Sequence, residues 1–285
     1  YWKLTDISGR MIQQGTWPAR TIPIGKNIPL GTATPDLSKL AAPGAYKLLV
    51  GLEKTTVENG WNFWVYPAAS EVTKPAEVTE TDNWVEAAKA LGNGAKVLFT
   101  PKQSDLDPSR SPAMKRVPVF WNIQMTVRPP RNNEPKFDAM LGLLCTPKHP
   151  ALAHFPTEGN CDWQWTPLVD NVRSINLSEM PIELKPIVAA IDDWNRNWRL
   201  GVLFECKAGN GRLMVCAIPL PASSPGARQL HRSILDYMGG DKFAPPVSVP
   251  IAELQKLWLG GTESGATPAV RKFDADLNDG SGAQP

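Results

Sequence analysis

The sequence lacks several features that would assign it to a familiar class of protein. No apolar run approaches the roughly 18–20 residues that a membrane-spanning helix needs, and no signal peptide is visible. There is no block of basic residues, and 30 Lys and Arg against 28 Asp and Glu leave a net charge of only +2. The charge pattern therefore gives no reason to expect a nucleic acid or a membrane as partner.

Cysteine is also scarce. Four cysteines are too few for a fold held together by disulfides in a chain of 285 residues. The lack of a CxxC pair disfavours a zinc ribbon or a thioredoxin-like site. We expect Cys206 and Cys216 to lie in a hairpin that turns at Gly209-Asn210. A two-residue turn there pairs position 206 with position 213, which disfavours a Cys206–Cys216 disulfide. Buried free thiols are the expected state.

What is present indicates an α+β, multi-domain protein. Hydrophobic residues make up 42% of the chain, enough for a sizeable core, and 28 prolines with 22 glycines favour loops and short strands. Several short strands punctuated by glycine and proline predict an N-terminal immunoglobulin-like β-sandwich over residues 1–67. Residues 68–82 are polar and indicate a linker.

Residues 83–245 predict an α/β domain with a central, mostly parallel sheet. Asp82 can cap a helix over residues 83–91, and a glycine turn then leads into an apolar strand over residues 95–100. Apolar residues at helical spacing predict a second helix over residues 224–238. Residues 246–285 indicate an extended or mobile C-terminal tail, in which Trp258 is expected to be the last residue that docks.

Two groups of motifs resemble a known family. The first is "NGWNFWVYP" (59–67), and the second runs from "LLCTPKHPALAHFPTEGNCDWQW" (143–165) through "PIVAAIDDW" (186–194) to "ARQLHRSILDYMGGDKFAP" (227–245). Together they resemble the C-terminal region of bacterial glycoside hydrolase family 2 proteins of the β-galactosidase-like kind. The resemblance implies an immunoglobulin-like module followed by a glutamine-amidotransferase-like α/β domain, in a periplasmic or extracellular protein.

The same resemblance implies that this chain does not carry the family's catalysis by itself. The family's two catalytic glutamates lie in a (β/α)₈ barrel. Such a barrel takes about 250 residues, and this chain is too short to contain one after the predicted sandwich. Because the chain starts at Tyr1, we interpret it as a fragment that follows such a barrel. It would be a non-catalytic accessory region for domain packing, for oligomer contacts including a homo-oligomer, or for shaping the substrate pocket.

Paired carboxylates are the first candidates for chemistry. Glycoside hydrolysis needs two carboxyl groups about 5–10 Å apart. Glu158 and Asp162 are close in sequence, but a convergent partner for Glu158 could come only from the fold. Asp192 and Asp193 are adjacent, so on a strand they point to opposite faces and are more typical of a strand end. Neither pair predicts a catalytic site.

A thiol nucleophile or a metal centre has less support. None of the four cysteines has the Gly-x-Cys-x-Gly frame of a nucleophile elbow, although a degenerate amidotransferase-like hydrolase stays as an alternative. His149 and His154 are five residues apart across a Pro-Ala-Leu turn, which is not the i, i+4 spacing of a zinc site on a helix. The sequence predicts neither a metal nor a cofactor.

Aromatic residues give the most plausible ligand signal, because sugars bind to flat rings and to polar groups beside them. On an extended segment Trp163 and Trp165 would face the same side, whereas Trp61 and Trp64 are assigned to the sandwich or its junction. Two interpretations remain for the Trp163/Trp165 pair: structural packing, in the core or at a domain interface, or contact with a galactoside or plant polysaccharide in a stand-alone carbohydrate-binding module. The candidate carbohydrate-binding residues are Trp163, Trp165, Glu158, Asp162, Trp121, Asn122, Asp192 and Asp193.

Overall fold

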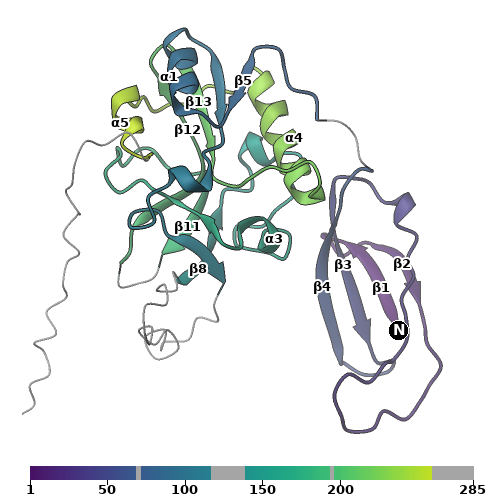
Figure 1. Ribbon diagram of the computed structural model, residues 1–285. Helices are drawn as coiled ribbons and strands as arrows, with labels where there is room; N and C mark the ends of the chain where they lie inside the picture. Colours follow the sequence, from purple (N-terminus) through teal and green to yellow (C-terminus); the bar gives the residue numbers. More distant parts are fainter. Residues whose placement is uncertain (69–71, 117–138, 193–195, 259–285) are drawn as a thin grey trace, which may run out of the picture.

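A computed structural model describes residues 1–68, 72–116, 139–192 and 196–258 (Figure 1). It contains a small N-terminal sheet and a larger sheet covered by helices on both faces, so the protein is β-rich and multi-domain. The N-terminal sheet has four antiparallel strands in the order β2-β1-β3-β4. Their bounds are β1 Trp2–Asp6, β2 Met11–Gly15, β3 Gly44–Gly51 and β4 Glu58–Val65.

The predicted immunoglobulin-like sandwich is wrong for residues 1–67, all of which the structure describes, because they form one sheet instead of two. Residues 16–43 contain five prolines, which cannot donate to a strand ladder. Apart from a single 3₁₀ turn, η1 Leu37–Lys39, this segment is an irregular layer. It packs Trp17 and Leu40 against the buried core of the sheet around Leu4.

The larger sheet is mixed, so the predicted mostly parallel sheet is also wrong. Among the described strands, three pairings are parallel (β5·β6, β6·β13 and β7·β8) and five are antiparallel. Short connections between β11, β12 and β13 force these strands to alternate in direction. The strands are β5 Val78–Thr81, β6 Lys96–Phe99, β7 Ala113–Arg116, β8 Ala139–Cys145, β9 Val172–Arg173, β10 Ile175–Asn176, β11 Val188–Asp192, β12 Arg199–Ala208 and β13 Gly211–Cys216.

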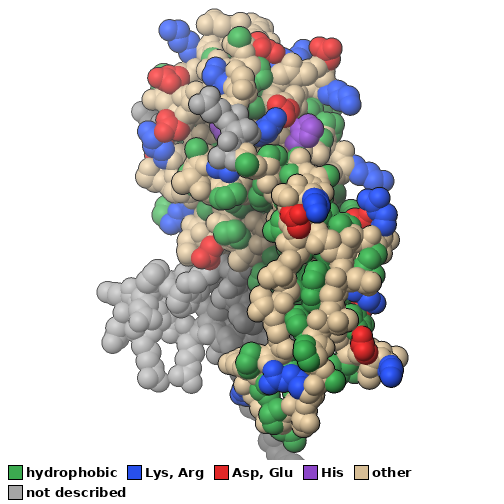
Figure 2. Space-filling model, turned by 90° about the vertical axis from the view of Figure 1, so that its right-hand side faces the viewer, with side chains coloured by type: hydrophobic (Ala, Val, Ile, Leu, Met, Phe, Trp, Pro, Cys, Tyr) green, Lys and Arg blue, Asp and Glu red, His purple; other side chains and the backbone are tan. Residues whose placement is uncertain are grey.

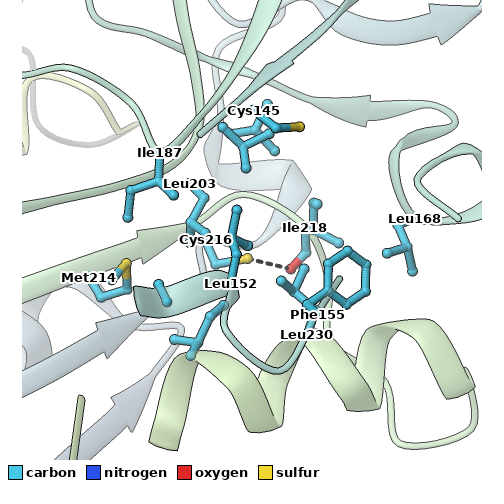
Figure 3. Close-up of a cluster of buried hydrophobic side chains, with 14 of the residues drawn as sticks. Cys145, Leu152, Phe155, Leu168, Ile187, Leu203, Met214, Cys216, Ile218 and Leu230 are labelled. Carbon is cyan, nitrogen blue, oxygen red and sulfur yellow. Dashed lines mark hydrogen bonds between the residues drawn. The ribbon is translucent and has the colours of Figure 1, made fainter. Parts of the chain in front are cut away.

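The β12–β13 hairpin confirms the predicted register, because Cys206 lies opposite Leu213. Cys216 lies three positions further along β13, where its Sγ is 3.5 Å from the carbonyl oxygen of Ile218 (Figure 3). All four cysteines are free thiols. The turn therefore sets a register in which these two thiols do not meet.

Helices cover both faces of the larger sheet. α4 (Pro225–Gly239), α3 (Thr166–Val169) and the 3₁₀ turn η3 (Pro150–Leu152) contribute to the core on one face. α1 (Trp84–Gly92) and α5 (Ile251–Gln255) contribute to the core on the other. A further 3₁₀ turn, η2, spans Gln103–Asp105. Within the described parts of the chain, no helix has the length and apolar character needed to cross a bilayer.

The caps of the two longer helices show how local sequence sets their starts. Ser224 accepts from the backbone N–H of Ala227 at the start of α4, where the predicted helix also begins. Asn83, and not Asp82, caps α1, and its side chain accepts from the N–H groups of Val85 and Glu86. The predicted helix is right, but its cap is wrong by one residue.

Both predicted boundaries of the α/β unit shift outward. The expected linker 68–82 is too long, because Val78 is buried and residues 78–81 form β5, hydrogen-bonded to β6. The expected tail from residue 246 is wrong over residues 246–258, which include α5. Trp258 docks as predicted, with its ring 4.8 Å from that of Phe99. Residues 259–285 lie outside the described part of the chain.

Candidate functional site

The aromatic segment 155–165 connects η3 to α3 and is not extended. Residues 163–165 form a turn, and Trp165 already has helical backbone angles. Alternation with period two therefore does not apply, and the expectation that Trp163 and Trp165 face one side is wrong. Trp163 is 68% exposed, whereas Trp165 is completely buried.

Asp162 closes this segment on itself. Its carboxylate accepts from the backbone N–H of Gln164 at 3.1 Å and from the Gln164 side-chain amide at 3.2 Å. The Thr157 hydroxyl lies 3.3 Å away and the Glu158 N–H 3.5 Å away. Burial raises the pKa of Asp162, and these hydrogen bonds oppose that shift. The carboxylate is thus engaged by its own loop.

The buried Trp165 joins the loop to the core. Its indole N–H donates to the Thr157 hydroxyl at 2.7 Å, and its ring meets Phe155 edge to face with centroids 4.9 Å apart. Phe155 is itself fully buried among the residues of the α4-side core (Figure 3). The predicted carbohydrate residue Trp165 therefore presents no ring face to solvent.

The same segment contacts the N-terminal sheet. The ring of Tyr66, just after β4, stacks on Phe155 with centroids 6.3 Å apart and planes inclined by 13°. The Tyr66 hydroxyl donates to Gln164 Oε1 at 2.7 Å, and the Asn62 amide donates to Glu158 Oε1 at 3.1 Å. We call these five residues, Asn62, Tyr66, Phe155, Glu158 and Gln164, the junction.

Asn62, Tyr66 and Gln164 were not predicted as site residues, although the sequence carried a signal for the first two. Strand alternation in "NGWNFWVYP" places positions 62, 64 and 66 on one face and positions 61, 63 and 65 on the other. Phe63 and Val65 pack into the core of the N-terminal sheet, so the other face is available to the junction. Gln164 carries no comparable signal, because its role depends on how the loop folds.

Asp192 lies elsewhere and has a structural role. It ends β11, and its buried carboxylate forms a two-pronged ion pair with Arg196, with its shortest contact at 2.6 Å. The Trp198 N–H also donates to it at 2.8 Å, and the Arg196 guanidinium lies over the Trp198 ring. None of these partners belongs to the junction. Trp121, Asn122 and Asp193 lie outside the described residues.

The three buried thiols are not activated as nucleophiles. Burial raises the pKa of Cys145, Cys206 and Cys216 to about 12, so these thiols stay protonated at neutral pH. The three histidines instead lie beside carboxylates, the closest being His231 at 2.6 Å from Glu80. Among the residues that the structure describes, no group of three His, Cys, Asp or Glu side chains could hold a metal ion.

Comparison with known families agrees with this division into two units. The family described as "Domain of unknown function (DUF8487)" matches residues 79–259, which is more than half of the chain. The chain belongs to this family. A second family, "Domain of unknown function (DUF8488)", matches residues 1–67, the N-terminal sheet. No curated protein matches the chain. Neither family description states an activity, so functional inference rests on the geometry.

Proposed function

We propose that this chain is a non-catalytic accessory region of a larger, β-galactosidase-like glycoside hydrolase. Its N-terminal sheet would be held in a fixed position on the α/β unit, so that the pair forms one rigid support for the parent protein. The observation that carries the proposal is the junction, where Tyr66 both stacks on Phe155 and donates a hydrogen bond to Gln164.

The two carboxylates of the junction segment already serve structural purposes. The Asp162 carboxylate accepts hydrogen bonds within its own loop, and the Glu158 carboxylate accepts a hydrogen bond from the Asn62 amide across the junction. A hydrolytic pair needs both carboxyl groups free to face one scissile bond. Their present partners favour a role in holding the loop and the junction together over a role in catalysis.

The strength of the junction fits a positional role. A stacked aromatic pair contributes about 0.5–1.5 kcal/mol beyond its area. A hydrogen bond such as that from Tyr66 to the buried Gln164 contributes about 0.5–1.5 kcal/mol, and removing it leaves a buried acceptor unpaired. Together these contacts favour one orientation of the sheet without requiring a large apolar interface.

Paired variants at Tyr66 test the proposal. Tyr66→Phe keeps the stacked ring and loses the hydroxyl, whereas Tyr66→Ala loses both contacts. We expect limited proteolysis between the two units to accelerate in the order wild type, Phe, Ala, and small-angle scattering to show the Ala variant more extended. Trp163→Ala, at an exposed position, is the matched control and should behave like wild type.

Activity assays complete the test. The full chain should not hydrolyse a nitrophenyl β-galactoside above background. Turnover that Glu158→Gln or Asp162→Asn abolishes, in a variant that stays folded, would overturn the non-catalytic assignment. A Tyr66→Ala variant as compact and as protease-resistant as wild type would overturn the role given to the junction.

A further inference from the structure

The N-terminal sheet carries an open groove of about 760 Å³ that is lined by none of the junction residues and that the proposed accessory role does not use. Three aromatic side chains line it: Tyr1, Trp17 and Trp61. Trp61, which was assigned to the expected sandwich or to the boundary that follows it, lies on β4 and is 46% exposed. Figure 2 shows hydrophobic side chains gathered over the lower half of the molecule, where the N-terminal sheet lies. The groove has the size of a small-ligand site.

Two of the aromatic rings are held in place. The Tyr1 hydroxyl donates to Glu58 Oε2 at 2.7 Å, and the Trp17 indole N–H donates to the carbonyl oxygen of Thr32 at 3.1 Å. Gly51 lies against Tyr1 and Gly31 against Trp17, so closely that a Cβ at either glycine would collide with the ring. The rings are therefore set before any ligand arrives, which lowers the entropy cost of binding.

The polar side chains of the groove balance in charge. Arg20 and Lys54 face the same groove as Glu53 and Glu58, so the lining has no net formal charge. Asn59 adds an amide that both donates and accepts. A balanced lining of this kind fits an uncharged ligand with many hydroxyl groups better than it fits an anion or a cation.

We propose that this groove binds a neutral oligosaccharide. Sugar rings have an apolar C–H face that can cover Trp61 and Trp17, while their hydroxyls bond to groups such as Glu58, Asn59 and Arg20. A purely apolar peptide would cover the same rings but would shield these polar groups from water without replacing the hydrogen bonds that they make with it, which is unfavourable. The inference stands on the groove and does not depend on the junction.

Titration of the full chain tests the groove, with β-1,4-galactotetraose and cellotetraose as probes and heat of binding as the readout. We expect saturable binding to at least one probe. Trp61→Ala should weaken it about tenfold, because the aromatic platform is removed. Glu58→Gln, which keeps an acceptor for Tyr1, should weaken it by a smaller factor. Trp163→Ala is the matched control, an exposed tryptophan on the other unit, and should bind like wild type.

The controls separate this inference from the accessory role. Each variant must unfold at the wild-type temperature and keep the wild-type proteolysis pattern at the junction. No binding of either probe up to about 10 mM would overturn the groove assignment and leave the junction untouched. Binding lost in Trp163→Ala but kept in Trp61→Ala would move the sugar site to the α/β unit. Self-association abolished by Trp61→Ala, without sugar binding, would replace the sugar by a second copy of the chain.

Discussion

Substituting alanine for Trp163 and for Trp165, one at a time, should change the stability of the protein by very different amounts. Trp165 is completely buried, its N–H is bonded to Thr157, and its ring contacts Phe155. Trp165→Ala removes all of this and leaves a cavity, which typically costs about 3–5 kcal/mol. Trp163 is 68% exposed, so Trp163→Ala should change the free energy of unfolding by only about 0.5 kcal/mol.

The assay is thermal unfolding of the α/β unit followed by far-ultraviolet circular dichroism, which does not depend on tryptophan fluorescence. Trp165→Ala should lower the melting temperature by roughly 6–20 °C, and Trp163→Ala by at most a few degrees. Trp165→Phe should fall between them, because it keeps a ring against Phe155 but loses the bond to Thr157 and part of the volume of the indole. Equal losses at Trp163 and Trp165 would refute this assignment and favour an extended segment with both rings on one side.

Three further outcomes follow from the same geometry. With a thiol reagent in the native state, Cys161 should react first, and the three buried thiols only on unfolding, because their pKa of about 12 and their burial suppress reaction. Asp192→Ala removes the buried carboxylate that accepts from Arg196 and from the Trp198 N–H, and should cost about 3–5 kcal/mol in urea unfolding. Burial raises the pKa of Asp162 in the folded protein above its unfolded pKa of 3.8. The contribution of this group to stability is therefore complete below pH 3.8 and is lost as the pH rises through the folded pKa. Asp162→Asn should flatten that part of the curve of melting temperature against pH.

Elements with local signals were predictable from sequence. The helix over residues 224–238 has apolar residues at helical spacing and a serine cap, and α4 occupies almost the same range. The turn at Gly209-Asn210 predicted the register of the hairpin correctly, and this register keeps the thiols of Cys206 and Cys216 apart. In each case the information lies within a few residues of the element, so no knowledge of distant packing was needed.

Features that depend on distant partners were not predictable. Residues 78–81 belong to a segment with the polar composition of a linker, and they form a strand because they pair with β6. The N-terminal region has strand-like segments, but whether they form one sheet or two depends on the proline-rich residues 16–43. The direction in which Trp163 points depends on the hydrogen bonds of Asp162, which no periodicity in the sequence encodes.

The candidate site shows why residue types near one another in sequence are a weak guide to a ligand. Segment 155–165 has carboxylates beside tryptophans, the composition of a sugar site, yet its carboxylates and Trp165 are already bonded within the protein. A binding surface requires side chains whose faces are left open once the fold is complete. Trp61 meets that condition in the groove, beside rings that glycines and hydrogen bonds hold still. We therefore propose packing for the junction and sugar binding for the groove, the two roles that the composition of segment 155–165 had suggested for that segment alone.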